Sequence, residues 1–338
     1  MIRRLAALSV ALGLAWGLLA GSAAAATPPA KAACDRACLN GFTDAYLKAL
    51  AAHDPKAVPS SPGVKFTEDG APLRLGDGLW RTIDGLDSYR LDFADPRTGR
   101  AGALVTVKEN GVTALMALRL KVVAGKIAEV ETVLARKGEL QSLQTALLDK
   151  PLPILEQDVP AARRSSRAEL VGIVDKYFDA IEQGDGSIVP FARDGFRIEN
   201  GVRTCNNPAP MGAGAPSDFA KLGAMACADQ LSTKIFTYIQ SIRPRRYVVV
   251  DQERGLVLGV FRFNHPGDVP YVDSKEFGRL SMAGNPWASR PTSALIAELF
   301  KIEDHKIQRV MAVITNVPYR MPTGWPGDQS LSPPPAPR

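Results

Sequence analysis

Glu298 is the side chain in this sequence whose surroundings most clearly favour acid/base chemistry. It interrupts an alternating pattern in which the residues on its own face are Ala294, Ile296, Phe300 and Ile302. A carboxylate without a partner in such a face is driven toward its neutral form, as a general acid or a poised base requires. The alternatives are an ion pair with Arg262 on a neighbouring strand, or exposure near a sheet edge.

Two tyrosines stand at equivalent places on two expected helices. Tyr177 lies on or beside the apolar face of the second helix, and Tyr46 stands 131 residues before it. A phenol hydroxyl can stabilise a developing oxyanion when the pocket is dry and a base is near. The alternative interpretation is a buried tyrosine whose hydroxyl has one structural partner.

Glu68 ends a short strand that follows the first helix. Its alternation with Val64 and Phe66 predicts that it points inward, either as a proton shuttle or as a hydrogen-bonded carboxylate at a strand end. In the equivalent strand the alternation of Phe196 and Ile198 predicts that Glu199 points outward.

The three histidines are His53, His265 and His305, and none has the spacing of a zinc hydrolase motif. His265 ends an expected strand beside an insertion, where it could serve as an acid or a base at a pocket rim. The sequence also lacks a nucleophile elbow and a phosphate-binding loop. We therefore expect neither a metal nor an organic cofactor.

These candidates belong to two copies of one pattern. Residues 46–70 and 177–201 share seven identities in 25 ungapped positions, and residues 114–130 and 294–310 share seven in 17. Each copy begins with an amphipathic helix, because its apolar residues recur every three or four positions. A repeat of this length indicates a duplicated domain rather than a solenoid.

Long strands are expected to close each copy. In the first copy they span 101–108, 113–123 and 126–135, joined by turns at Glu109-Asn110-Gly111 and Ala124-Gly125. A helix first and a meander of strands last predict an α+β domain.

The pattern "YLKALAAHDPKAV", followed by a strand with paired acids, resembles the group of ketosteroid isomerases, SnoaL-like cyclases and scytalone dehydratase. This group has the cone-shaped fold of nuclear transport factor two. The chain also resembles secreted proteins with tandem domains of this fold that carry "CDRACL", "KFTEDG" and "GDGLW". In the isomerases a tyrosine on this helix donates to a developing enolate and a carboxylate on the next strand shuttles the proton. The resemblance extends these roles to Tyr46, Tyr177 and Glu68.

The resemblance implies an α+β fold of two tandem cone-shaped domains, each a curved antiparallel sheet wrapped around N-terminal helices. The two domains would form an intramolecular pseudo-dimer. We expect SnoaL-like domain 1 at 34–137, a linker at 138–164, SnoaL-like domain 2 with two insertions at 165–322, and a disordered tail at 323–338.

The first 26 residues have the features of a signal peptide. Arg3 and Arg4 precede an apolar stretch and a run of small residues that ends at Ala26. A retained anchor helix is the alternative. We expect a periplasmic or secreted protein.

The four cysteines of an exported chain then predict two disulfides. Three pairings are possible, and the most local are Cys34 with Cys38 and Cys205 with Cys227.

The second copy carries two insertions, a loop at 205–227 and an expanded hairpin at 264–293, so we expect it to hold the pocket. The expected function is cofactor-free isomerisation, dehydration or cyclisation of a small apolar carbonyl or hydroxyl compound. Tyr177 would be the oxyanion donor, and Glu298 or His265 the proton shuttle. The alternative is a noncatalytic small-molecule binding or structural protein of the same fold.

The distribution of charge indicates which classes of partner the chain can bind. The formal net charge is +6, and basic and acidic residues are interspersed, so we expect no nucleic-acid partner. We expect a small-molecule ligand and no membrane contact after signal removal. A homo-oligomer is left open.

Overall fold

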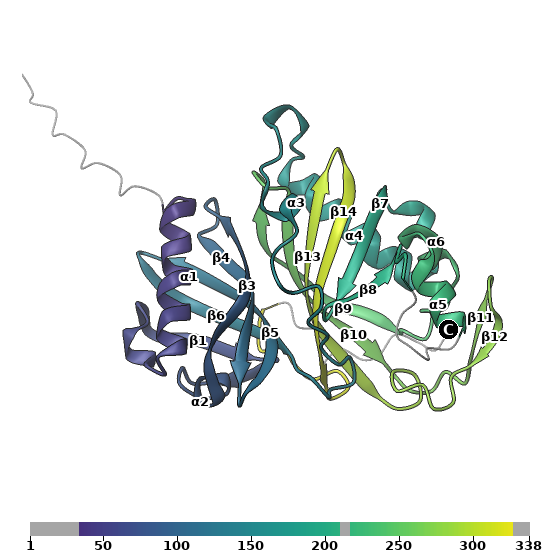
Figure 1. Cartoon of the computed structure of the whole chain (residues 1–338), viewed down its shortest axis with the longest axis horizontal. Coiled ribbons are helices and arrows are strands. Elements are labelled where there is room, and N and C mark those ends of the chain that lie inside the picture. The colour runs from purple at the N-terminus through teal and green to yellow at the C-terminus, as the bar shows by residue number, and fades with distance from the viewer. Residues whose placement is uncertain (1–33, 210–216, 327–338) are drawn as a thin grey trace, which may run out of the picture. The chain divides into compact units, whose positions relative to one another are not determined.

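The computed structural model describes residues 34–209 and 217–326, which form two six-stranded sheets and a small hairpin sheet (Figure 1). The first half (residues 34–135) contains α1 (Arg36–Ala51), η1 (Pro55–Ala57), β1 (Ser60–Glu68), β2 (Ala71–Leu73), α2 (Leu79–Thr82), β3 (Ile83–Asp95), β4 (Arg100–Glu109), β5 (Val112–Val123) and β6 (Lys126–Ala135). The connecting segment contains α3 (Pro153–Glu156) and η2 (Ala161–Arg163). The second half (residues 166–317) contains α4 (Arg167–Gln183), η3 (Gly186–Ile188), β7 (Phe191–Glu199), β8 (Val202–Cys205), α5 (Ser217–Ala224), α6 (Cys227–Ser232), β9 (Ser241–Asp251), β10 (Leu256–His265), β11 (Tyr271–Ser274), β12 (Gly278–Ser281), β13 (Thr292–Glu303) and β14 (Lys306–Val317).

The two large sheets have the same topology. Their strand orders are β2-β1-β6-β5-β4-β3 and β8-β7-β14-β13-β10-β9. The register also agrees, because Phe66 pairs with Val130 and Arg197 with Val310, at the two offsets seen in the sequence. The repeat in the sequence is therefore a repeat in the structure.

Both sheets are mixed, so the prediction of purely antiparallel sheets is wrong. β1 runs parallel to β6, and β7 runs parallel to β14, while the other pairs are antiparallel. Hairpins force antiparallel pairing only between strands that follow each other directly. The first strand of each half instead meets the last one, after a long excursion of the chain.

Each half begins with a capped helix that covers one face of its own sheet. Asp35 caps α1 by accepting a bond from the Cys38 N–H, and Ser166 caps α4 by accepting one from Glu169. The apolar faces of α1 and α4 join two separate hydrophobic clusters with their sheets. Each sheet therefore has a helix-facing side and an opposite side.

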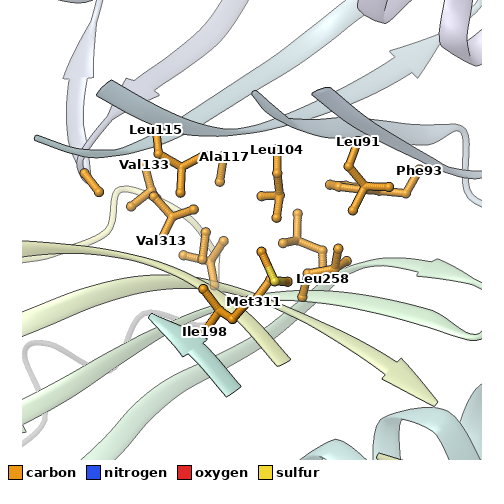
Figure 2. Packing of buried hydrophobic residues seen from close by; sticks show 14 of the residues in the cluster. Leu91, Phe93, Leu104, Leu115, Ala117, Val133, Ile198, Leu258, Met311 and Val313 are labelled. Atoms are coloured by element: carbon orange, nitrogen blue, oxygen red, sulfur yellow. The ribbon is translucent and has the colours of Figure 1, made fainter. Parts of the chain in front are cut away.

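The opposite sides of the two sheets share one hydrophobic cluster. Figure 2 shows Leu91, Phe93, Leu104, Leu115, Ala117 and Val133 of the first half facing Ile198, Leu258, Met311 and Val313 of the second. Leu143, Leu148 and Leu155 of the connecting segment are buried in the same cluster. Both faces of each sheet are thus largely covered.

Two ion pairs link the halves in a reciprocal manner. Arg36 Nη1 lies 2.6 Å from Asp251 Oδ2, and Arg167 Nη1 lies 2.7 Å from Asp95 Oδ2. Arg167 stands 131 positions after Arg36. Each aspartate also accepts a bond from a backbone N–H of the other half. Reciprocal contacts of this kind are typical of an interface between equivalent subunits.

The C-terminal segment 318–326 packs against the first half. Trp325 is only 5% exposed, and its indole N–H donates to Thr67 Oγ1 at 2.9 Å. The prediction of disorder from residue 323 is therefore wrong for residues 323–326. The rest of that tail, and the predicted signal peptide, lie outside the described residues.

Two disulfides are formed, as predicted, and they join the two most local pairs, Cys34 with Cys38 and Cys205 with Cys227. Among the described helices, none has both the length and the apolar character that a membrane-spanning helix requires.

Candidate active site

A cavity of about 340 Å³ lies in the second half, between the helix-facing side of its sheet and the helices α4, α5 and α6. Its volume is near the lower end of the roughly 300–1,000 Å³ typical of ligand pockets. The polar groups of its wall include Tyr177, Arg197, Glu199, Gln230, His265 and Glu298. Its aromatic wall contains Phe236, Tyr238, Phe263 and Trp287.

Glu298 lies on the helix-facing side of β13, as its alternation with apolar residues predicts. Its neighbours on the adjacent strands are Gly259 and Ala312, and the ring of Phe261 packs over Gly259. The residue is 2% exposed, and Oε2 has no hydrogen-bond partner among the described residues. Burial and the nearby Glu199 raise the pKa of Glu298 to about 8, against the opposing effects of Arg197 and a hydrogen bond from Tyr177.

An ion pair of Glu298 with Arg262 does not form. Arg262 lies on the other side of its sheet and donates to Asn264 Oδ1 and to the backbone carbonyls of Arg320 and Met321. That sequence-based alternative is wrong.

Arg197 of β7 connects several polar groups of the wall. Nη1 donates to the Tyr177 hydroxyl at 3.2 Å, Nη2 to Gln230 Oε1 at 2.6 Å and Nε to Thr204 Oγ1 at 2.9 Å. Nε also lies 3.0 Å from Glu199 Oε1. Burial lowers the pKa of Arg197, but Glu199 and Tyr177 outweigh this effect, so the guanidinium stays charged. Burial raises the pKa of Tyr177 well above its ordinary value, so its hydroxyl is protonated.

The position of Glu199 corrects the sequence-based prediction. Glu199 lines the cavity, whereas Phe196 and Ile198 belong to the cluster between the sheets. Residues of β7 do alternate between two faces, but its apolar face points to the first half rather than to the helix. Because a sheet buried on both sides has no solvent face, alternation alone does not show which side is inside the cavity.

His265 occupies another part of the same wall. It is 3% exposed, and its ring lies 5.8 Å from that of Tyr238 and 5.2 Å from that of Trp287. Burial lowers the pKa of His265 to about 4, so the imidazole is neutral at pH 7. Nδ1 has no hydrogen-bond partner among the described residues.

A family model matches residues 32–134 and 163–314, which together make up most of the sequence. The chain belongs to the DUF8021 family. The description of this family is "Domain of unknown function". Among curated proteins, none matches the chain significantly.

Three solved structures that resemble the DUF8021 chain each match about a third of its length. A de novo designed protein with a curved β-sheet matches 30% of the chain and 87% of its own, at 16% identity and a TM-score of 0.26. A candidate ketosteroid isomerase from Kribbella flavida matches 34% of the chain and 90% of its own, at 15% identity and a TM-score of 0.25. A protein with a ketosteroid isomerase-like fold from Catenulispora acidiphila, in complex with trimethylamine, matches 30% and 87%, at 12% identity and a TM-score of 0.23.

The structure does not bring Tyr46 and Glu68 of the DUF8021 chain to this cavity. Tyr46 packs edge-on against Trp80, with 5.4 Å between the ring centroids. Glu68 accepts the backbone N–H of Leu79 at 3.0 Å and lies 3.7 Å from Arg136. Burial raises the pKa of Glu68, and those two contacts oppose the rise.

Sequence reasoning missed Arg197 and Gln230. The ungapped comparison of the two copies offered a signal for Arg197, because it places a charge where the first copy has the buried Phe66. Gln230 lies in the segment between β8 and β9, which is much longer than its equivalent in the first half, so the comparison of the two copies offers no signal for it. Within residues 34–209 and 217–326, no group of three or more His, Cys, Asp and Glu side chains could hold a metal ion.

Proposed function

We propose that this protein is an exported small-molecule enzyme that performs cofactor-free acid/base chemistry in the cavity of its second half. The substrate class is a small apolar carbonyl or hydroxyl compound, and the reaction is an isomerisation, a dehydration or a cyclisation. One observation carries the proposal: the buried, unpartnered Oε2 of Glu298 in the cavity wall. Leaving a buried polar atom without a partner is costly, and a ligand that binds there removes that cost.

Glu298 has the protonation behaviour that such chemistry needs. With a pKa of about 8, roughly nine in ten Glu298 side chains are protonated at pH 7. A protonated Glu298 donates a hydrogen bond or a proton to a ligand oxygen. Its ionised form accepts a proton from carbon next to a carbonyl group, so both directions of transfer are accessible near neutral pH.

Tyr177 and Arg197 supply positive potential beside Glu298. The Tyr177 hydroxyl accepts a bond from Arg197, and its own proton can serve Glu298 or the oxygen of an enolate. His265 is a neutral group on the same wall, which makes it the second candidate for moving a proton. An isomerisation returns the proton to another carbon, so no oxidant or cofactor is consumed.

Noncatalytic binding of a small molecule is the second candidate function. It is favoured by the aromatic wall, since Phe236, Tyr238 and Trp287 can recognise a ring by packing alone. In that case the ligand would bind and leave unchanged.

Hydrogen–deuterium exchange separates the two functions without knowledge of the product. Ligands from a thermal-shift screen of ketones, phenols and lactones are incubated with the protein in D₂O, and the loss of C–H signals is followed by NMR. Exchange next to the carbonyl that disappears in Glu298→Gln supports the enzyme. Stabilisation by ligands without exchange supports binding. The matched control is Glu68→Gln, which changes a buried carboxylate of the first half and leaves the cavity intact.

The organisation of the chain belongs to the same proposal. SnoaL-like domain 1 spans 34–137, a linker spans 138–164, and SnoaL-like domain 2 spans 165–322. The reciprocal pairs Arg36–Asp251 and Arg167–Asp95 support an intramolecular pseudo-dimer. Residues 1–26 are proposed to be a signal peptide, which agrees with the two disulfides. Mass spectrometry of the secreted protein tests the cleavage, because a chain that retains Met1 would contradict it.

A further inference from the structure

Gln230 reaches the cavity from the segment between β8 and β9, which is much longer than the segment between β2 and β3 in the first half. It stands on α6 and is 1% exposed. Its Oε1 accepts a bond from Arg197, and its Nε2 donates to the backbone carbonyls of Thr204 at 2.6 Å and Leu222 at 2.9 Å. The orientation of this amide is therefore fixed by three bonds.

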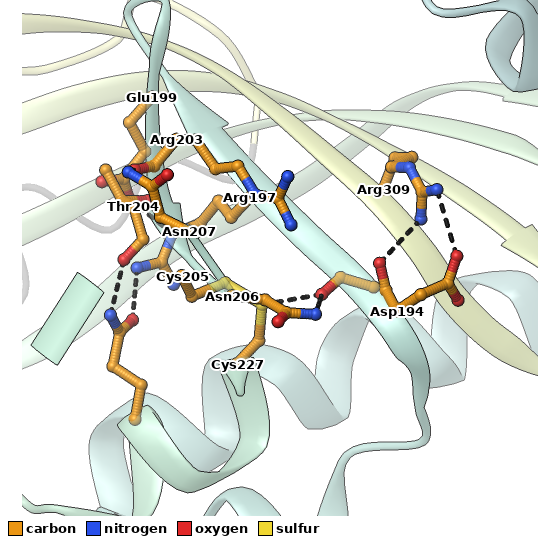
Figure 3. Close-up of a disulfide and its surroundings, with 12 residues drawn as sticks. Asp194, Arg197, Glu199, Arg203, Thr204, Cys205, Asn206, Asn207, Cys227 and Arg309 are labelled. Carbon is orange, nitrogen blue, oxygen red and sulfur yellow. Dashed lines mark hydrogen bonds and ion pairs between the residues drawn. A yellow bond between two sulfur atoms is a disulfide. The ribbon is translucent and has the colours of Figure 1, made fainter. Parts of the chain in front are cut away.

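The disulfide between Cys205 and Cys227 holds together the two segments that bind Arg197. Thr204 directly precedes Cys205, and Gln230 follows Cys227 by one helical turn. Figure 3 shows Arg197, Thr204 and the disulfide in one region of the second half.

α6 is also docked against η3. A Cβ atom at Gly186 would lie 1.8 Å from the carbonyl oxygen of Ala228 in α6, so only glycine allows this approach. The Ser232 hydroxyl at the end of α6 accepts the Gly186 N–H at 2.9 Å. α6 is thereby held in place at both of its ends.

Arg197 would have one obvious alternative partner if these bonds were lost. Among the described residues of the cavity wall, two buried polar atoms have no hydrogen-bond partner, His265 Nδ1 and Glu298 Oε2. Only Glu298 can offer a negative charge to a guanidinium. The charged or titratable groups that act on Glu298 are Arg197 and Glu199 from β7 and Tyr177 from α4. Its neighbours on β10 and β14, Gly259 and Ala312, do not titrate.

We propose that Gln230 is a positioning residue that keeps Arg197 bound to β8 and α6 and so prevents an ion pair between Arg197 and Glu298. This inference rests on the role given to Glu298 in the proposed function. Held in this position, Arg197 polarises Tyr177 and leaves Glu298 protonated at neutral pH. The long segment between β8 and β9 then has a defined role, because it supplies the acceptor that a buried arginine at this place in β7 requires.

The test is a direct titration of Glu298 in the full protein without ligand. Difference infrared spectra against Glu298→Gln report its protonated carboxyl group as a function of pH. In Gln230→Met, which keeps the length of the side chain but removes the acceptor, we expect the pKa of Glu298 to fall from about 8 to below about 7. This is a change of about tenfold or more in proton affinity. An unchanged pKa in a folded Gln230→Met protein would overturn the proposal.

Two further variants keep the test decisive. Thr204→Val removes the hydroxyl that accepts a bond from Arg197 Nε. Because Nε keeps its contact with Glu199, we expect a smaller fall in the pKa of Glu298 than in Gln230→Met. This variant decides the matter if Gln230→Met does not fold, and an unchanged pKa there would contradict the inference. Ser232→Ala is the matched control, since it weakens the docking of α6 without touching Arg197 and should leave the Glu298 titration unchanged. If it shifts the titration as much as Gln230→Met does, the effect is one of general stability and the proposal fails.

Failure of this inference and failure of the proposed function have different signatures. The titration needs no turnover, so it decides the role of Gln230 even if no substrate reacts. An unshifted titration together with loss of deuterium exchange in Glu298→Gln would refute the inference and leave the proposed function standing.

Discussion

Equivalent positions of the two halves carry apolar side chains in the first half and charged side chains in the second. Where the first half has Phe66 and Leu118 in its helix-facing core, the second has Arg197 and Glu298. Tyr46 packs against Trp80, whereas the equivalent Tyr177 binds Arg197 at the wall of a cavity. The comparison shows that one topology holds an apolar core in the first half and a polar pocket at equivalent positions in the second.

The shared glutamates sharpen this contrast. Glu68 and Glu199 occupy equivalent positions on the helix-facing side, yet Glu68 accepts the Leu79 N–H of α2 while Glu199 pairs with Arg197. α2 fills the place near the end of the first strand pair, whereas the second half has the disulfide-bonded segment there. The carboxylate has a structural role in the first half and an electrostatic one in the second.

Leu118→Glu should produce the largest effect, because it places a carboxyl group in the first half where the second half has Glu298. Leu118 is fully buried among apolar side chains, with no arginine at the position of Phe66. We expect a loss of more than about 5 kcal/mol in the free energy of unfolding at pH 7. Urea unfolding measures it, with Leu118→Gln as the uncharged control. A loss below about 1 kcal/mol would mean that the first half already tolerates an interior carboxylate.

Glu298→Gln should change how stability depends on pH. The pKa of Glu298 rises from 4.5 to about 8 on folding, so the folded state binds more protons than the unfolded state between these values. The corresponding stability is fully present below pH 4.5 and is lost as the pH rises to about 8, by on the order of 4–5 kcal/mol. Urea unfolding from pH 4 to 9 should show a shallower slope in Glu298→Gln than in the parent. Identical slopes would show that Glu298 is ionised at neutral pH.

The parts of the fold with local signals could be predicted from the sequence. The turns at Glu109-Asn110-Gly111 and Ala124-Gly125 predicted strands within one residue of β4, β5 and β6. The four cysteines predicted two disulfides and left their pairing open. The direction of Glu199 could not be predicted, because sheet alternation identifies two faces without saying which one meets the other half. The role of Gln230 could not be predicted for another reason. Its partner Arg197 is distant in sequence, and the segment between β8 and β9 has no equivalent of similar length in the first half.

His265→Asn should remove a pH dependence of stability of opposite sign, at another part of the wall of the same cavity. Burial lowers the pKa of His265 from 6.5 to about 4, so the folded state binds fewer protons than the unfolded state between these values. This stability is present above pH 6.5 and is lost as the pH falls to about 4, by about 3 kcal/mol. The acid side of the urea unfolding profile should therefore flatten in His265→Asn. If it stays as steep as in the parent, another group controls the acid side.

The two tyrosines give the smallest and most specific comparison, because Tyr46→Phe and Tyr177→Phe remove one hydroxyl each from equivalent places. We expect Tyr177→Phe to lower the rate of deuterium exchange by about a hundredfold, equivalent to about 3 kcal/mol, since it removes the donor beside Glu298. Tyr46→Phe should leave that rate unchanged, because the cavity wall does not contain Tyr46. NMR in D₂O measures both rates under one set of conditions. Equal rates in the two variants would assign Tyr177 a packing role like that of Tyr46, and Glu298 and His265 would then have to move the proton without it.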